Sequence, residues 1–185
     1  MIVYVFVFFE LIGFTTNFLY NRTMKIILLS DTHRQREDIR KVREKYADAD
    51  YIVHCGDCLM SAEQIKELGI IAVEGNMDIG SGLPSERILE TEDFRILIIH
   101  GHMFYEGWYP DYRFVARYAK HKNCNVAFCG HSHEYFDKVV DDVRILNPGS
   151  TWRTRDPNSI RTYMVLNIEN HRIDVERHPA TDLYH

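Results

Sequence analysis

Short apolar runs rich in β-branched residues alternate with charged segments from Met24 onward. Three of these runs have the length and composition of buried strands: 25–29, 51–54 and 70–73. Residues 35–46 between them have the spacing of an amphipathic helix, and Ser61 with Gln64 predicts a capping box for a shorter helix that stops at Gly69. This order predicts a βαβαβ unit with parallel strands and right-handed crossovers.

The second half of the chain is dominated by strands joined through short polar turns. The predicted strands are 87–91, 94–99, 126–129, 135–140, 143–146, 163–168 and 172–177. One helix is predicted at 110–122, with Pro110 near its first turn and Phe114, Val115 and Tyr118 at helical spacing. A parallel half followed by antiparallel hairpins fits an α/β (α+β) fold in which two sheets pack face to face with helices outside.

Five short patches of polar residues each follow one of these apolar runs. They are Asp31-Thr32-His33, Gly56-Asp57, Gly75-Asn76, His100-Gly101-His102 and Gly130-His131-Ser132-His133. Open α/β sheets place their chemistry at the edge where the parallel strands end, so the five patches are expected to meet there. Their carboxylate, amide and imidazole groups are metal-ligand types, and the sequence therefore points to one composite metal site.

Taken alone, each patch has an ordinary explanation. Gly-Asp and Gly-Asn commonly mark turns, and Asp31 with His33 could be loop residues. Two His-x-His pairs at the ends of apolar strands are harder to explain by packing, because buried imidazoles need partners. Asp31 and His33 are also two apart, and in an extended strand end their side chains point the same way, so a carboxylate and an imidazole could bind one ion. The ordered set is therefore a stronger signal than any single patch.

Composition limits the alternatives. A chain of 185 residues that is 45% hydrophobic can bury the core of one domain, and a formal net charge of -5 argues against general nucleic-acid binding. Four cysteines are too few for a secreted disulfide framework, which favours a reducing compartment. The spacing of Cys55 and Cys58 fits a redox or zinc pair, but with Asp57 between them a buried apolar role is favoured.

The stretch from Ile2 to Tyr20 is very apolar and rich in Phe, but Glu10 interrupts it. No Lys or Arg precedes it, so it lacks the basic start of a secretory signal. We interpret 1–23 as a hydrophobic N-terminal extension that the folded domain at 24–185 does not need. A membrane anchor or a dimer contact remains the alternative, and a cytoplasmic protein is expected.

The ordered patches, together with Asn147-Pro148-Gly149-Ser150, resemble the motifs of the calcineurin-like metallophosphoesterase superfamily, in its compact bacterial and archaeal phosphodiesterase branch. The resemblance runs from Met24 nearly to the C-terminus. It implies a four-layer αββα sandwich of two mixed β-sheets whose motifs surround two divalent ions.

Carried over to this chain, the resemblance implies a set of metal ligands: Asp31, His33, Asp57, Asn76, His100, His131 and His133. Asp31, His33, Asp57 and His133 would surround the first ion. The second would take Asp57, Asn76, His100 and His131, so that Asp57 bridges the two. This mixed set suits Mn²⁺ and would admit Fe, Ni²⁺, Co²⁺ or Zn²⁺.

The implied activity is phosphodiester hydrolysis by a metal-bridging hydroxide, with His102 and Asn76 as catalytic residues. Many phosphomonoesterases of the superfamily have His directly after the Gly-Asn asparagine, whereas this chain has Met77. The leaving-group acid is therefore missing or moved. His102 is the best substitute and Asp78 the second, although His102 could equally orient a metal ligand.

Other functions on the same fold stay open at this point. They are a phosphomonoesterase, a nucleotide pyrophosphatase, and a non-catalytic scaffold, which the intact His33 and Asp57 disfavour. The expected partner is a small phosphodiester, without bulk nucleic-acid binding and with a membrane role only if 1–23 act as an anchor. A homo-oligomer, dimer or tetramer, is also expected. Trp152 and Arg153 could line a substrate pocket or form core contacts.

Overall fold

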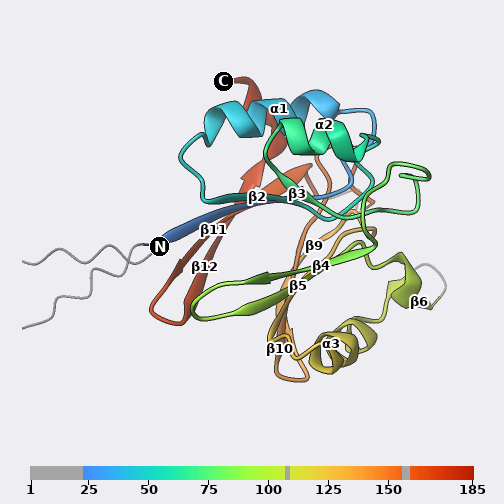
Figure 1. Ribbon diagram of the computed structural model, residues 1–185, viewed down its shortest axis with the longest axis vertical. Helices are drawn as coiled ribbons and strands as arrows, with labels where there is room; N and C mark the ends of the chain where they lie inside the picture. The colour runs from blue at the N-terminus through green and yellow to red at the C-terminus, as the bar shows by residue number, and fades with distance from the viewer. Residues whose placement is uncertain (1–22, 107–108, 156–158) are drawn as a thin grey trace, which may run out of the picture.

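Two five-stranded mixed sheets form the centre of the protein (Figure 1). The structure is a computed structural model and describes residues 23–106, 109–155 and 159–185. The first sheet contains β1 (Met24–Leu29), β2 (Tyr51–His54), β3 (Ile71–Ala72), β11 (Thr162–Glu169) and β12 (Arg172–Pro179). The second contains β4 (Glu86–Glu90), β5 (Arg95–Ile99), β8 (Val126–Phe128), β9 (Tyr135–Val140) and β10 (Val143–Pro148). A short hairpin, β6 (Tyr105–Glu106) with β7 (Tyr109–Pro110), lies outside both sheets.

The strand order explains why both sheets are mixed. The first sheet runs β12-β11-β1-β2-β3, with β1, β2 and β3 parallel and β11 antiparallel to β1. The second runs β4-β5-β8-β10-β9, with β5, β8 and β10 parallel and an antiparallel strand on each side. The predicted parallel unit and the predicted hairpins are therefore confirmed.

Helices cover the outer face of each sheet (Figure 1). The helical segments are α1 (Arg36–Lys45), α2 (Ala62–Glu67), α3 (Tyr112–His121) and the 3₁₀ turns η1 (His102–Phe104) and η2 (Ala180–Tyr184). The predicted capping box is present at α2, where the Ser61 side chain accepts from the Gln64 N–H and the Gln64 side chain from the Ser61 N–H.

Three buried clusters define four layers. On β1, Ile26 and Leu28 pack between the sheets, whereas the alternate residues Ile27 and Leu29 pack against the side that carries α1 and α2. The third cluster lies between the second sheet and α3, around residues such as Val115. The αββα sandwich is confirmed.

The prediction for the third helix was wrong at its start. Pro110 belongs to β7, and Asp111 is the N-cap, with its carboxylate accepting from the Arg113 N–H. The buried face of α3 is formed by Val115, Ala116 and Ala119, while Phe114 is 42% exposed. A β-hairpin that pairs Pro110 with Tyr105 cannot be read from apolar spacing alone.

Among the described residues, no helix is long and apolar enough to cross a membrane. The hydrophobic extension predicted at 1–23 lies outside them, apart from Thr23.

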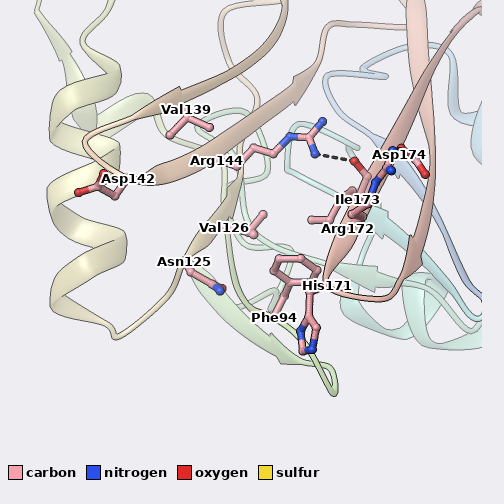
Figure 2. Close-up of a pocket in the computed structure, with 10 residues that line it drawn as sticks. All are labelled: Phe94, Asn125, Val126, Val139, Asp142, Arg144, His171, Arg172, Ile173 and Asp174. Carbon is pink, nitrogen blue, oxygen red and sulfur yellow. Dashed lines mark hydrogen bonds and ion pairs between the residues drawn. The ribbon is translucent and has the colours of Figure 1, made fainter. Parts of the chain in front are cut away.

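A groove of about 490 Å³ opens between the two sheets at one edge of the sandwich. Figure 2 shows Phe94, Asn125 and Asp142 around it, and these residues directly precede β5, β8 and β10. Arg144 reaches across it and donates a hydrogen bond of 2.5 Å to the carbonyl of Ile173 (Figure 2). The groove therefore lies at the amino ends of the parallel strands, opposite to the edge where the polar patches end.

Candidate metal centre

The predicted ligands all follow the carboxyl ends of parallel strands. Asp31 and His33 follow β1, Asp57 follows β2, Asn76 follows β3, His100 follows β5, and His131 and His133 follow β8. Since the two sheets pack face to face, these ends meet at one rim, and the distances below bring the seven side chains together there.

The spacing argument assumed that the ligands lie on extended strand ends, but the loops that carry them are not extended. Asp31, His33, Asp57, His131 and His133 all have positive φ, between 41° and 67°. Non-glycine residues rarely adopt this left-handed conformation, and it persists where the surrounding structure enforces it. Asp31 and His33 do converge, but through sharp left-handed turns rather than an extended strand end, whereas His131 and His133 turn toward different ligand groups.

Three side chains form the first ligand group, which we call site 1: Asp31, His33 and His133. Nε2 of His133 lies 3.1 Å from Oδ1 of Asp31, and Nε2 of His33 lies 3.9 Å from the same oxygen. The two imidazole Nε2 atoms are 3.3 Å apart. All three residues are buried, and one cation placed among these atoms would be held by one carboxylate and two imidazoles.

A second group, site 2, contains Asp31, Asp57 and His100. Nε2 of His100 lies 3.5 Å from Oδ2 of Asp57 and 4.0 Å from Oδ1 of Asp31. Asn76 Oδ1 and His131 Nδ1 approach the same nitrogen at 3.1 Å and 3.2 Å. These two side chains would complete the coordination of an ion at site 2.

Two carboxylates lie between the histidines of the two sites. Oδ1 of Asp31 belongs to both groups, and Oδ2 of Asp57 lies 3.7 Å from His33 and 3.5 Å from His100. The resemblance assigned the bridge to Asp57 alone. Asp31 could bridge as well, because its Oδ1 lies within 4.0 Å of the imidazoles of site 1 and of His100 in site 2.

The buried oxygens test whether these residues fit metal ions. Oδ2 of Asp31 accepts hydrogen bonds from the Ser30 hydroxyl and the His131 N–H, at 2.6 Å and 2.9 Å. Oδ1 is fully buried, and no donor among the described residues forms a hydrogen bond with it. A buried carboxylate oxygen without a donor is costly unless a cation satisfies it, so the residues present fit a metal.

Backbone carbonyls fix the orientation of two imidazoles. His133 donates from Nδ1 to the carbonyl of Arg153 at 2.8 Å, and His100 donates from Nδ1 to the carbonyl of Cys55 at 2.7 Å. A neutral imidazole that donates from Nδ1 presents the lone pair of Nε2, and in both residues Nε2 faces the carboxylates. Both side chains are therefore prepared as metal ligands.

The electrostatics favour the metal-binding forms of the two carboxyls and of two imidazoles, whereas at His100 the contacts with Asp31 and Asp57 outweigh burial and raise the pKa. Burial opposes ionisation of Asp31 and Asp57, but His100 with His133 and Ser30 at Asp31, and His100 with the Met77 N–H at Asp57, together outweigh it. The pKa of both carboxyls is therefore lowered. Burial lowers the pKa of His33, and burial together with the charge of His100 lowers the pKa of His131 to about 4. At neutral pH the carboxylates are therefore charged and these two imidazoles neutral.

Two glycines are required by close approach rather than by ordinary turns. A Cβ at Gly75 would collide with the carboxylate and backbone of Asp57, and a Cβ at Gly56 would lie 2.8 Å from Nδ1 of His100. Gly56 also has a φ of +96°. The Gly-Asp and Gly-Asn pairs thus pack against each other, which sequence alone presented as possible turns.

Asp78 does not face the ligands as a proton donor would. Its Oδ2 accepts from the backbone N–H groups of Asp57 at 2.6 Å and Gly75 at 2.9 Å, and its Oδ1 accepts from Leu59 at 2.7 Å. The carboxylate is buried and ties the loops after β2 and β3 together. This argues against Asp78 as the leaving-group acid.

His102 lies at the open side of the centre. Its ring centroid is 5.5 Å from that of His100 and 6.1 Å from that of His131, and the residue is exposed. Partial desolvation of the ring and the charge of His100 lower the pKa of His102. Its position next to a predicted ligand is compatible with proton transfer to a bound substrate.

Sequence reasoning missed the residues that support the ligands. His54 accepts from the Gly56 N–H at Nδ1 and contacts the Thr32 hydroxyl through Nε2 at 3.1 Å, which links two ligand loops. Ser30 holds Asp31. Each sits within three residues of a polar patch, but a buried serine or histidine has no spacing signature of its own.

The aromatic and sulfur-containing residues divide into two groups. Trp152 contacts His33 and His133, whereas Tyr112 stacks on Phe136 at 3.7 Å and belongs to the core. Trp108 lies outside the described residues. The four cysteines are free and buried, and burial raises the pKa of Cys58 to about 12, which fits a packing role rather than a redox one.

Two curated relatives resemble most of this chain. A probable metallophosphoesterase of Methanocaldococcus jannaschii is 35% identical over 84% of this chain and 82% of its own length. A phosphodiesterase of the same organism is 33% identical over 68% of this chain and 83% of its own length.

Solved structures share the fold. A predicted phosphoesterase from Streptococcus pneumoniae TIGR4 has a TM-score of 0.78 at 25% identity and covers 86% of this chain and 91% of its own. The zinc complex of Vps29 from Entamoeba histolytica has a TM-score of 0.64 at 21% identity, over 85% of this chain and 99% of its own. Below 25% identity, this second likeness concerns the fold alone.

Residues 24–171 match the sequence model of one protein family, the calcineurin-like phosphoesterase superfamily domain. That range contains all seven predicted ligands. The curated relatives point to the same family at 33% to 35% identity. The chain therefore belongs to the calcineurin-like phosphoesterase superfamily.

Proposed function

We propose that this protein is a metal-dependent phosphodiesterase with a dinuclear centre. The observation that carries the proposal is the pair of ligand groups that share Asp31, with Asp57 between their histidines. Two divalent cations bound there would polarise the phosphate and lower the pKa of a shared water enough to supply the nucleophile. The similarity to a phosphodiesterase of Methanocaldococcus jannaschii supports a diester substrate.

The side chains of this chain would divide the remaining work. Asn76, exposed beside His100, would hold both an ion and a phosphate oxygen. His102 would donate a proton to the leaving group from the open side of the centre. Met77, at the position where many phosphomonoesterases of the family have histidine, is 55% exposed and cannot donate one, which favours diesters.

The proposed metal is Mn²⁺, because two carboxylates, an amide and imidazoles without thiolate form a ligand set of intermediate hardness. We propose a small phosphodiester as the substrate, a cytoplasmic location and a homo-oligomeric state. A scaffold function is disfavoured because every predicted ligand is present and the buried Oδ1 of Asp31 accepts no hydrogen bond from the described residues.

The test starts from protein stripped with a chelator. Mn²⁺ should restore hydrolysis of bis(p-nitrophenyl) phosphate, and Asp57→Asn and His131→Ala should each lower the restored rate by at least about 100-fold. Asp141→Asn, on the exposed turn between β9 and β10, is the control and should keep the full rate. Full activity in both ligand variants would refute the dinuclear mechanism.

A second comparison separates diester from monoester chemistry. We expect bis(p-nitrophenyl) phosphate to be cleaved faster than p-nitrophenyl phosphate at equal concentrations. The reverse preference would identify a phosphomonoesterase, and faster release of phosphate from nucleoside triphosphates would identify a pyrophosphatase. Metal analysis of the protein as purified identifies the ion.

A further inference from the structure

The turn after β10 carries a motif that the ligand set does not use, Asn147-Pro148-Gly149-Ser150, and it is anchored to the loop after β1. The Ser150 hydroxyl is buried and donates to the carbonyl of Asp31 at 2.7 Å. The hydroxyl oxygen of Ser150 also accepts hydrogen bonds from the backbone N–H groups of Trp152 and Arg153, both at 3.0 Å. Residues 150–153 are therefore fixed relative to the first ligand of site 1.

Two consecutive residues of this turn contact the two histidines of site 1. The carbonyl of Arg153 accepts from Nδ1 of His133 at 2.8 Å. The indole of Trp152 lies against His33, with ring centroids 4.6 Å apart and an interplanar angle of 58°. The rings of Trp152 and His133 form a T-shaped pair, with centroids 6.1 Å apart and an interplanar angle of 67°.

His33 differs from the other buried ligands in how its ring is oriented. His100 and His133 are each held by a backbone carbonyl, but no carbonyl of the described residues accepts from His33. Its backbone has a φ of +41°, a left-handed conformation that is strained for a non-glycine residue. The ring contacts that fix it are those with Trp152 and His133.

We propose that Trp152 is a positioning residue of site 1, which braces the imidazoles of His33 and His133 so that both Nε2 atoms meet one ion. The inference rests on the proposed metal centre and goes beyond it. A metal ion makes the imidazole ring electron-poor, and the electron-rich face of an indole attracts such a ring more strongly than it attracts a neutral one. The contact therefore favours the metal-bound form.

The test measures metal binding rather than turnover. Chelator-stripped protein is titrated with Mn²⁺ in a calorimeter, and two binding steps are expected. Trp152→Ala should weaken one step about 10- to 100-fold, the range for losing a group that orients a ligand, and should leave the other step unchanged. Trp152→Phe keeps an aromatic face and should recover most of the affinity. Phe114→Ala, at an exposed position on α3, is the control.

A spectroscopic arm uses the fact that the chain has two tryptophans, Trp108 and Trp152. In Trp108→Phe the remaining emission comes from Trp152, and Co²⁺ should quench it in the step that Trp152→Ala weakens. Thermal unfolding of each stripped variant shows whether it is folded. If Trp152→Ala is not folded, Trp152→Leu, which keeps bulk but removes the aromatic face, takes its place and should show the same loss of affinity.

The outcomes are distinguishable. If Trp152→Ala binds both ions with the affinity of the wild type, or loses only affinity for aryl substrates, the inference is wrong while the proposed function stands. If the wild type binds two ions and Trp152→Ala shows the predicted loss of affinity, yet the wild type cleaves no diester, the inference is supported and the proposed function is overturned. Wild-type protein that binds no divalent ion would overturn both.

Discussion

Single residues at the metal centre depend on a backbone that the sequence does not reveal. The residue types and their order were enough to predict that Asp31, His33 and the later histidines share a site. Their local geometry was not predictable, because five ligands sit at positive φ, where non-glycine residues are rare. Such conformations are enforced by neighbours such as Ser30 and Ser150, whose contacts span up to 119 positions in the chain.

His102 allows a residue-scale prediction about leaving groups. If His102 donates the proton, His102→Ala should slow cleavage of a diester with an alkyl leaving group about 10²- to 10⁴-fold. It should slow cleavage of a p-nitrophenyl diester far less, because nitrophenolate leaves without protonation. Steady-state rates for the two substrates, with exposed His121→Ala as the control, measure the difference.

An orienting role for His102 gives another pattern. The ring lies 5.5 Å from His100, so loss of orientation would lower the Mn²⁺ affinity and slow both substrates equally. Equal losses would therefore remove His102 from the role of acid.

Secondary-structure elements were the most predictable part of the molecule. Apolar runs of four to eight residues gave most strands to within one or two residues, since burial on both faces selects continuous β-branched sequence. Two features escaped: the β6–β7 hairpin and the 3₁₀ turns at 102–104 and 180–184. These short elements have no periodicity, and tertiary contacts define them. The capping box at Ser61 was predictable because its hydrogen bonds are local.

The junction between the β2 and β3 loops gives a prediction at the element scale. Asp78 accepts backbone N–H groups from both loops, so Asp78→Ala leaves buried donors unpaired at Asp57 and Gly75 and a partly buried one at Leu59. We expect the free energy of unfolding to fall by about 2–4 kcal/mol and the Mn²⁺ affinity to fall about 10- to 100-fold. Urea unfolding of stripped protein and calorimetry measure the two effects.

Asp78→Asn is the matched variant for this junction. Its amide keeps one acceptor oxygen, so its losses should be smaller than those of Asp78→Ala. If both variants kept the wild-type metal affinity, the loops would not need Asp78 to hold their ligands. A loss confined to substrates with poor leaving groups would instead restore Asp78 as an acid.

At the scale of the whole molecule, the two edges of the sandwich differ in their chemistry. Parallel strands of both sheets end at the metal centre, whereas their amino ends border the groove in which Arg144 bonds Ile173 and no predicted ligand appears (Figure 2). This polarity follows from topology, because parallel strands in each sheet point the same way. The sequence order of strands and helices was sufficient to predict it.

The boundary of the folded unit supplies the last prediction. β1 begins at Met24 and is central in its sheet, paired with β11 through Met24 and Ile168 and with β2 through Ile26 and Tyr51. The family match also begins at residue 24. A chain that starts at Met24 should therefore fold, with the thermal midpoint and the Mn²⁺ affinity of the full chain. Circular dichroism and calorimetry measure both.

A shorter chain that starts at Leu28 provides the contrast for this experiment. It removes Ile26 and Ile27, which are fully buried on opposite faces of the sheet, and should not fold, because each lost side chain alone costs about 2–5 kcal/mol. If the chain from Met24 also failed to fold, residues 1–23 would be integral to the domain, and the interpretation of them as a dispensable extension would be wrong.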